Sequence, residues 1–279
     1  MADRLGSPVV GAVSQGAGFT PGFASVLTCE DGTQHFVKAA SVKAQRTFAD
    51  SYREEARKLR ALPPETPAPR LLWTDEVEDW FLLGIEYVAA RAPHRPWTEE
   101  DLAAASEMAA RMADVLTPAP GIGMETAVEE FASWPALWQS IDHPRAAEIG
   151  ALAAQFAEVV AGETLVHTDI RDDNILIRDD GSALLCDWNW PVRGAAWLDS
   201  LFLLIGPRGD GLDVDAHIAT HPLLAAVPAE HIDIALALIL AYFTTSAAGP
   251  VPSTSPHIRA AQAWQRDVID GWLAERRGW

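Results

Sequence analysis

The sequence predicts an α+β protein with two lobes: a small N-terminal lobe with an antiparallel sheet and one helix, and a larger, mainly helical C-terminal lobe. Over the first 90 residues, short apolar or alternating segments are separated by Gly, Pro and acidic turns, as in β-hairpins. From residue 97 onward, longer apolar segments of helical length dominate, and strand-like sequence interrupts them once. We therefore expect an N-lobe at residues 1–88 and a C-lobe at 89–279.

Each lobe has its own run of expected elements. In the N-lobe, strands are expected at 9–13, 24–28, 35–40, 70–73 and 80–88, and one helix at 47–62 ends at the pair Pro63-Pro64. Thr98 and Asp101 resemble a capping box, and the helix they begin is expected to end near Leu116. The remaining C-lobe helices are expected at 144–161, 195–205, 229–247 and 256–275.

Composition and charge exclude several classes of function. The formal net charge of −18 argues against non-specific nucleic-acid binding, which requires Lys and Arg to neutralise phosphates, but it is compatible with a cationic substrate. Two cysteines, Cys29 and Cys186, give no disulfide framework, so a cytoplasmic protein is expected. The N-terminus lacks the apolar segment of a signal peptide, and the longest strongly apolar stretch, 234–243, is too short to cross a bilayer. We expect neither nucleic acid nor a membrane as a partner.

The segment LVHTDIRDDNILIRDDGSALLCDWNW, residues 165–190, concentrates the chemistry. Asp169 and Asn174 flank a loop before one apolar strand, and Asp187 directly follows a second. If the strands form a hairpin, the three side chains meet, offering one carboxylate as a base and two oxygen ligands for Mg²⁺. That set suits phosphoryl transfer.

Turn formation is the alternative explanation for Asp and Asn in this segment. These residues favour turns, and Asp179-Asp180-Gly181 is interpreted as the turn of the hairpin itself. Asp187 is different, because it lies between Ala-Leu-Leu-Cys and Trp188, where a charge without a partner is costly. The complete set therefore favours a site.

These residues also carry a family resemblance. The stretch 167–174, HTDIRDDN, resembles the H-x-D-x-x-x-x-N catalytic loop of the protein-kinase-like fold. Cys186-Asp187-Trp188 resembles its metal-binding Asp, in the Asp-Trp form of aminoglycoside phosphotransferases. The resemblance implies that Asp169 accepts or orients the proton of the substrate hydroxyl, and that Asn174 and Asp187 bind Mg²⁺.

Three further residues acquire roles from the same resemblance. His167 is expected to support the catalytic loop, and Asp199 resembles the Asp of the family's D-L-A helix, which braces that loop. Arg171 either stabilises charge on the transferring phosphoryl group or pairs with Asp172 or Asp173.

The N-lobe supplies the nucleotide-binding residues that a kinase-like fold requires. Lys38 lies inside an apolar strand segment, where the family's Lys holds the α- and β-phosphates. Its helix partner is expected to be Glu55, because the pattern Glu-Ala-x-x-Leu-x-x-Leu resembles the family's helix; Glu54 is expected to be a surface charge that pairs with Lys58.

The loop and the hinge complete the predicted nucleotide site. Ser14, Gly16 and Gly18 lie in a small-residue loop whose backbone N–H groups can approach phosphates, and the loop lacks the Gly-Lys-Ser/Thr ending of Walker-type ATPases. The resemblance implies that the backbone from Glu86 to Val88 binds adenine.

The chain departs from the family pattern in ways that concern the acceptor. Thr168 replaces a usual Gly, Asn189 a frequent acidic residue, and Gly194-Ala195-Ala196 the usual Gly-Asp-Pro. Only 11 residues separate Asp187 from Asp199, too few for a peptide-binding activation segment, so a small acceptor is expected. Its pocket is expected among acidic and aromatic side chains that suit amines; the candidates are Asp210, Asp213, Asp215, Trp134, Trp138, Trp190 and Trp264.

We therefore predict an ATP- or GTP-dependent, Mg²⁺-dependent O-phosphotransferase of the aminoglycoside-phosphotransferase type. Its acceptor is expected to be the hydroxyl of a small amine-bearing molecule, an aminoglycoside or another antibiotic, with a role in resistance. Two alternatives stay open: a metabolite kinase acting on choline, a sugar or an amino alcohol, and a catalytically silent binding module. The presence of Lys38, Asp169, Asn174 and Asp187 argues against the silent module.

Overall fold

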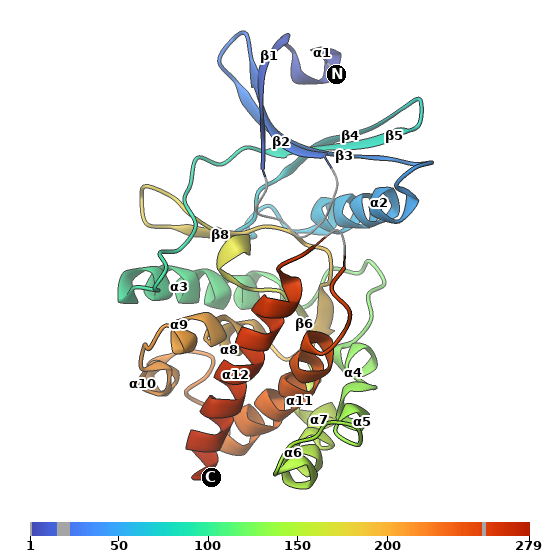
Figure 1. The fold of residues 1–279 in the computed structure, drawn as a ribbon. Helices are drawn as coiled ribbons and strands as arrows, with labels where there is room; N and C mark the ends of the chain where they lie inside the picture. Colours follow the sequence, from blue (N-terminus) through green and yellow to red (C-terminus); the bar gives the residue numbers. More distant parts are fainter. Residues whose placement is uncertain (1, 16–22, 253–254) are drawn as a thin grey trace.

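The N-terminal lobe is a five-stranded antiparallel sheet with one long helix on it. The computed structural model describes residues 2–15, 23–252 and 255–279. A short helix α1 (Ala2–Leu5) precedes a sheet of order β1-β2-β3-β5-β4, and helix α2 (Arg46–Ala61) lies against it (Figure 1). The strands are β1 (Val9–Ser14), β2 (Phe23–Cys29), β3 (Gln34–Ser41), β4 (Leu71–Val77) and β5 (Trp80–Glu86). The predicted N-lobe architecture is therefore confirmed.

Side-chain spacing explains how α2 meets the sheet. The buried residues of α2 recur at helical spacing on one face, and they are Ala49, Tyr52, Glu55, Ala56 and Leu59. Four of these are apolar, whereas Glu55 is a carboxylate. Burying its charge costs free energy unless an oppositely charged or hydrogen-bonding partner lies beside it. On β5, Gly84 is required by packing, because a Cβ there would lie 2.2 Å from the Trp73 ring. The indole of Trp73 thus lies directly on the strand.

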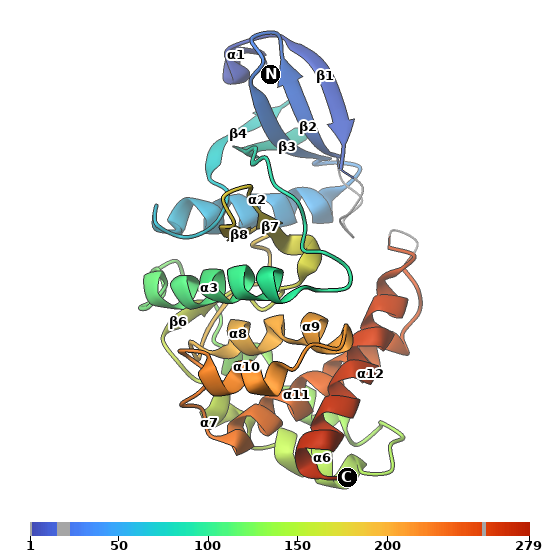
Figure 2. The ribbon, with the colours of Figure 1, turned by 90° about the vertical axis from the view of Figure 1, so that its left-hand side faces the viewer.

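The C-terminal lobe is mainly helical (Figures 1 and 2). Its helices are α3 (Glu99–Val115), α4 (Ala127–Glu130), α5 (Trp134–Leu137), α6 (Ala146–Ala153), α7 (Phe156–Val160), α8 (Leu198–Leu203), α9 (Ile205–Gly209), α10 (Val214–Thr220), α11 (Ala229–Ala247) and α12 (Ile258–Arg277). The expected helix at 144–161 is two short helices, α6 and α7, and α4, α5 and α10 were not predicted. The apolar stretch 234–243 lies within α11, whose residues 232–241 are all buried in the lobe. Within the described residues, none of the helices combines the length and hydrophobicity that a bilayer crossing requires.

The predicted hairpin lies between the helices of the C-lobe and the N-lobe. Strand β7 (Ile175–Ile177) pairs antiparallel with β8 (Ala183–Leu185), and the 3₁₀ turn η1 (Asp172–Asn174) leads into β7. Strand β6 (Thr164–Val166) precedes the hairpin in sequence and β9 (Val192–Gly194) follows it, and these two strands form a second antiparallel pair. The hairpin is therefore confirmed, and β9 is an additional strand that brings the segment after Asp187 back beside the start of the loop.

Asp101 fixes the connection between the lobes. Arg91 exchanges backbone hydrogen bonds with Ile177 of β7, and its guanidinium donates to the buried Asp101 carboxylate at 2.7 and 3.2 Å. The same carboxylate accepts the backbone N–H of His94 at 2.6 Å. The Thr98 hydroxyl does accept from the Asp101 N–H, so half of the predicted capping box is present. The other half is absent among the described contacts, because the Asp101 side chain bonds to the connecting segment instead.

We expect Asp101→Asn to lower the free energy of unfolding by about 2 kcal/mol near pH 7. Burial by itself raises the pKa of the Asp101 carboxyl, but hydrogen bonds from Arg91 and His94 outweigh it and lower this pKa to about 2. The unfolded value is about 3.9, so the stabilisation is present above that pH and is lost as pH falls towards 2. Urea unfolding of both proteins at several pH values tests this. A difference that stayed constant from pH 7 to pH 3 would contradict it.

Candidate active site

A cleft of about 860 Å³ is lined by residues of both lobes. The predicted site residues in its wall are Lys38, Glu55, Glu86, Val88, Asp169, Arg171, Asn174 and Asp187. Ser14 ends β1 next to Gln15, which lines the cleft, while Gly16 and Gly18 lie outside the described residues. The two predicted supporting residues, His167 and Asp199, are buried. The cleft therefore brings together Lys38 and Asp187, which are 149 positions apart in sequence.

Lys38 is the centre of a charge cluster in the wall of the cleft. From β3, its Nζ donates to both Glu55 oxygens, at 2.7 and 2.9 Å, and to Asp187 Oδ1 at 2.9 Å. Burial alone lowers the pKa of Lys38, but the two carboxylates outweigh it and raise this pKa above its usual value. For Asp187 the effects are opposite in sign: burial raises the pKa of the carboxyl group, but the positive charge of Lys38 outweighs burial, so this pKa is lowered. Lys38 is thus a permanent cation and Asp187 a permanent anion at neutral pH.

The structure distinguishes the two glutamates of α2. Glu55 is 1 % exposed and faces Lys38, as expected. Glu54 is exposed, but its partner is Arg57, at 2.9 Å, and not Lys58. The Lys58 ammonium instead donates to the backbone carbonyl of Asn189, which follows the Asp187 turn. The expected pairing of Glu54 with Lys58 is therefore wrong, because Lys58 reaches across to the C-lobe.

His167 and Asp199 hold the loop that carries Asp169. Asp199 accepts the backbone N–H groups of His167 and Thr168, at 2.7 and 2.9 Å. The His167 ring bonds to the carbonyl of Cys186 through Nε2, at 3.1 Å, and Nδ1 accepts the backbone N–H of Asp169 at 3.3 Å. Because a carbonyl only accepts and an N–H only donates, the ring is neutral with its proton on Nε2. It joins the Asp169 loop to the strand that leads into Asp187.

Two residues of the site adopt left-handed backbone conformations. Thr168 has φ 69° and Asp187 has φ 67°. Such conformations cost on the order of 1–3 kcal/mol for residues other than Gly and cluster at functional sites. Thr168 is compensated by the bond from its N–H to Asp199 and by its hydroxyl, which donates to the Trp190 carbonyl at 2.8 Å. The position where the family pattern has Gly is thus one where the backbone requires a positive φ.

Asp169 is oriented by its neighbours in the loop. Asn174 Nδ2 donates to the Asp169 carbonyl oxygen at 2.9 Å and to its Oδ2 at 3.2 Å. Arg171 Nε lies 3.3 Å from Asp169 Oδ1 and 2.9 Å from Asp173 Oδ1. Of the two pairings considered for Arg171, the one with Asp173 is present, whereas Asp172 pairs with Arg95 at 2.6 Å. The Asp169 carboxylate is therefore held in place and about one third exposed to the cleft.

The donors near Asp187 suit a hard divalent cation. Asp187 uses Oδ1 for Lys38 and Asn189, and no hydrogen bond within the described residues occupies its Oδ2. Asn174 donates through Nδ2, which leaves its oxygen as an acceptor. In the described part of the chain, His, Cys, Asp and Glu form no group of three or more that could hold a metal by themselves. The Asp187 carboxylate and the Asn174 amide oxygen fit Mg²⁺, which commonly binds through one or two protein side chains together with substrate phosphates and water.

Apolar side chains from both lobes line the part of the cleft next to the hinge. Ala24, Val26 and Phe36 come from the sheet above, and Ile175 and Leu176 come from β7 below. Residues 86–88 line the same cleft. Apolar side chains of this kind can pack on the faces of a flat heterocycle, and we call this part of the cleft the apolar slot.

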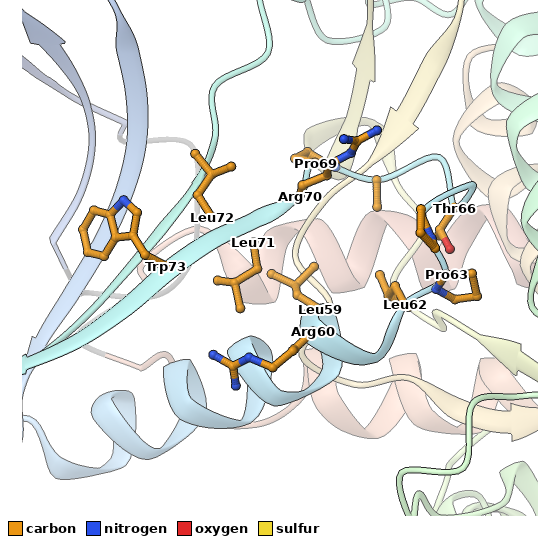
Figure 3. Close-up of a pocket in the computed structure, with 12 residues that line it drawn as sticks. Leu59, Arg60, Leu62, Pro63, Thr66, Pro69, Arg70, Leu71, Leu72 and Trp73 are labelled. Carbon is orange, nitrogen blue, oxygen red and sulfur yellow. The ribbon is translucent and has the colours of Figure 1, made fainter. Parts of the chain in front are cut away.

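A second, smaller cavity of about 350 Å³ lies at the C-terminal end of α2 (Figure 3). Its walls come from α2, the following Pro-rich segment and the start of β4, and it shares Leu59 and Pro69 with the large cleft. None of the charged residues described above lines it. The large cleft is therefore the candidate active site.

Comparisons with known proteins agree with this geometry. The model of the phosphotransferase enzyme family (APH) matches residues 25–229, which include Lys38, Asp169 and Asp187. No curated protein matches the chain in sequence.

Solved structures with the same fold cover almost the whole chain. An aminoglycoside phosphotransferase from Alicyclobacillus acidocaldarius superposes with a TM-score of 0.62 at 15 % identity, covering 97 % of this chain and 92 % of its own. A thermostable mutant of aminoglycoside phosphotransferase APH(4)-Ia, in ternary complex with ADP and hygromycin B, gives 0.67 at 15 % identity, with coverages of 98 % and 96 %. The choline kinase LicA from Streptococcus pneumoniae gives 0.63 at 15 % identity, with the same coverages. These enzymes share a protein-kinase-like fold with this chain, and the expected fold class is confirmed.

The family match spans most of the chain and contains the charge cluster and the catalytic-type loop that the structure brings together. The chain thus belongs to the phosphotransferase enzyme family and is a small-molecule kinase with a protein-kinase-like fold.

Proposed function

We propose that this protein transfers the γ-phosphoryl group of ATP or GTP, with Mg²⁺, to a hydroxyl group of a small acceptor. The observation that carries this proposal is the convergence in one cleft of the Lys38–Glu55–Asp187 cluster and the Asp169–Asn174 pair. Residues 1–88 would bind the nucleotide, and residues 89–279 would supply the catalytic loop and the acceptor pocket. The acceptor belongs to the antibiotics or to the small-metabolite alcohols.

Nucleotide binding falls to the N-lobe residues in this proposal. The base lies in the apolar slot with its edge against the backbone of Glu86 and Val88. Lys38 binds the α- and β-phosphates and is kept charged and in place by Glu55. The loop that contains Ser14, Gly16 and Gly18 offers backbone N–H groups to the phosphates.

The transfer step uses the C-lobe residues. Asp169 accepts the proton of the acceptor hydroxyl, whose oxygen forms a bond to the γ-phosphorus while the bond to the bridging oxygen breaks and the nucleoside diphosphate leaves. Asn174 and Asp187 would hold Mg²⁺, which when bound neutralises charge on the phosphate oxygens. Arg171, in contact with Asp169 and Asp173, lies beside the transferring group and stabilises its charge.

A transfer screen tests this function. Purified protein is incubated with Mg²⁺, with ATP or GTP, and with one member of a panel of antibiotics, amino alcohols, sugars and aliphatic alcohols. The mass of each acceptor is then measured by mass spectrometry. We expect one class to gain a single phosphoryl group, only with Mg²⁺ present and not after chelation with EDTA. Absence of transfer together with absence of nucleotide binding by calorimetry would overturn the proposal.

We expect Glu55→Gln to raise the KM for the nucleotide by about 10- to 100-fold. The change removes one of the two charges that hold Lys38, and a charge-assisted hydrogen bond of this kind contributes about 1.5–3 kcal/mol. Glu54→Gln is the matched control, because Glu54 is adjacent in sequence but exposed and paired with Arg57. Steady-state kinetics with varied ATP measure both variants. Equal effects of the two substitutions would contradict the role of Glu55.

A further inference from the structure

The acidic residues expected around the acceptor do not line the cleft. Asp210 accepts from Arg95 at 3.3 Å and from the Trp97 N–H at 2.8 Å. Asp213 caps α10, and Asp215 accepts from Arg276 and from the indole of Trp272. Each carboxylate is therefore used in packing the C-lobe, and the expectation of an acidic acceptor pocket built on them is wrong.

Of the four tryptophans expected around the acceptor, two line the cleft and two do not. Trp138 is buried and donates its indole N–H to the Ala237 carbonyl, and Trp264 stacks against Arg95; neither lines the cleft. Trp134 and Trp190 do line it. Trp190 is 68 % exposed, the highest value among the large hydrophobic residues of the described chain. A large indole left open to water beside the catalytic loop is apolar surface that a bound molecule could cover.

Trp134 belongs to a continuous aromatic surface on the C-lobe side of the cleft. Its ring centroid lies 4.4 Å from that of Phe131 and 4.6 Å from that of Tyr242, on which it stacks, and Tyr242 contacts Phe243 at 5.3 Å. We call Phe131, Trp134, Tyr242 and Phe243 the aromatic wall; all four line the cleft. They come from α5, the residue after α4 and the C-terminal part of α11, and α5 packs against α11 (Figure 1).

Aliphatic residues extend the aromatic wall. Ile205, Ile239 and Ile258 line the same cleft from α9, α11 and α12. Both ribbon views show the N-terminal end of α12 on the side of the C-lobe that faces the N-lobe (Figures 1 and 2). The acceptor side of the cleft is therefore lined by apolar side chains from several helices of the C-lobe, together with the uncharged Gln262 and Gln265 of α12.

Few charges remain to bind a cationic acceptor. The carboxylates in the cleft wall are Glu55, Glu86, Glu130, Asp169, Asp173 and Asp187. Five of these belong to the nucleotide, metal or proton-transfer groups or pair with Arg171. Among the described residues that line the cleft, only Glu130, at the end of α4, is left for the acceptor. A molecule with several ammonium groups would lose hydration against this wall without ion pairs to replace it, which is costly.

We infer that the acceptor is a hydroxyl-bearing small molecule with a broad apolar face and at most one cationic group. The inference rests on the proposed function. The apolar face packs on the aromatic wall and under Trp190, and its hydroxyl reaches Asp169. A single amine is accommodated by Glu130 and by the faces of the aromatic rings, which attract one cation.

Two groups of probes test the inference. Erythromycin and tylosin, which carry one amine, and chloramphenicol, which carries none, form the apolar group; kanamycin, gentamicin and hygromycin B form the polyamine group. Binding to the protein with bound ADP is measured by calorimetry, and transfer from Mg²⁺-ATP by mass spectrometry. We expect at least one apolar probe to bind more tightly than every polyamine by about tenfold or more. Tighter binding of a polyamine, or binding of no apolar probe, would overturn the inference.

Variants of the wall give a second, independent readout. Trp190→Ala is expected to raise the dissociation constant of the apolar probe about tenfold and to leave that of ATP unchanged. Because Trp190 is so exposed, its ring can be removed without leaving a core cavity. Trp134→Ala is the second variant of the wall and is measured in the same way. Trp80→Ala is the matched control, since Trp80 is 42 % exposed on the N-lobe and outside the cleft. Unchanged probe binding in both wall variants would overturn the inference.

Failure of the inference and failure of the proposed function give different results. Phosphorylation of a polyamine in preference to the apolar probes would leave the kinase function intact and overturn only the acceptor class. Binding of an apolar probe without any nucleotide binding would keep the acceptor pocket and overturn the kinase function. Glu130→Gln adds a finer check: it should weaken erythromycin and leave chloramphenicol unaffected.

Discussion

Asp169→Asn is expected to lower kcat for phosphoryl transfer by about 10²- to 10⁴-fold while leaving the nucleotide dissociation constant close to the wild-type value. Asparagine keeps the size of the side chain but cannot accept the proton of the acceptor hydroxyl. The carboxylate makes no contact with Lys38, whose partners are Glu55 and Asp187, so the nucleotide site is preserved. Rapid-quench measurement of transfer, with calorimetry of ATP binding, separates the two effects.

Asp172→Asn is the matched control for this substitution. Asp172 is in the same loop but pairs with Arg95 and does not line the cleft. We expect this variant to retain nearly full transfer. If both variants lost activity equally, the loss would reflect damage to the loop rather than removal of a base, and the assignment of Asp169 would be wrong.

Asp187→Asn is expected to abolish the gain in ATP affinity that Mg²⁺ provides, a loss of about 100-fold or more. Removing groups that only support a metal ligand already costs about 10- to 100-fold in metal affinity, so loss of a ligand carboxylate should cost at least as much. Asparagine is the suitable replacement because, at φ 67°, it tolerates the left-handed backbone better than alanine. Calorimetric titration of ATP with and without Mg²⁺ measures the gain directly.

Asp179→Asn provides the control for Asp187. Asp179 is in the turn of the same β7–β8 hairpin, where it is exposed. Its substitution should leave the Mg²⁺ effect on ATP affinity unchanged. A persistent Mg²⁺ effect in Asp187→Asn would contradict the role assigned to Asp187.

The sequence predicted those parts of the site that depend on local pattern. Lys38 interrupts an apolar strand, Glu55 interrupts the apolar face of a helix, and Asp187 follows an apolar strand, so each is a charge where a charge is costly. The hairpin between Asn174 and Asp187 followed from apolar runs on either side of an Asp-Asp-Gly turn. Such signals are contained in a few neighbouring residues, and the structure shows the hairpin and the contacts of Lys38 with Glu55 and Asp187.

Features that depend on distant contacts could not be predicted in the same way. In the sequence, Asp210 and Asp215 suggest an acidic pocket. In the structure, Asp210 pairs with Arg95, 115 positions away, and Asp215 pairs with Arg276, 61 positions away. The buried carboxylate of Asp101 looked like part of a helix cap, because its bonds to Arg91 and His94 have no pattern in the sequence. Thr168 did carry a signal, since the family has Gly at the one loop position where φ is positive.

The most direct test of the account follows the γ-phosphoryl group of ATP in a single turnover. Enzyme in excess over γ-¹⁸O-labelled ATP is mixed with Mg²⁺ and the best acceptor of the apolar group, and the label is traced by mass spectrometry in wild type and Asp169→Asn. We predict that the labelled phosphoryl group appears on the acceptor hydroxyl in step with ADP, and that the variant forms neither product at a comparable rate. Label released only as inorganic phosphate, or transferred equally fast by Asp169→Asn, would contradict the account.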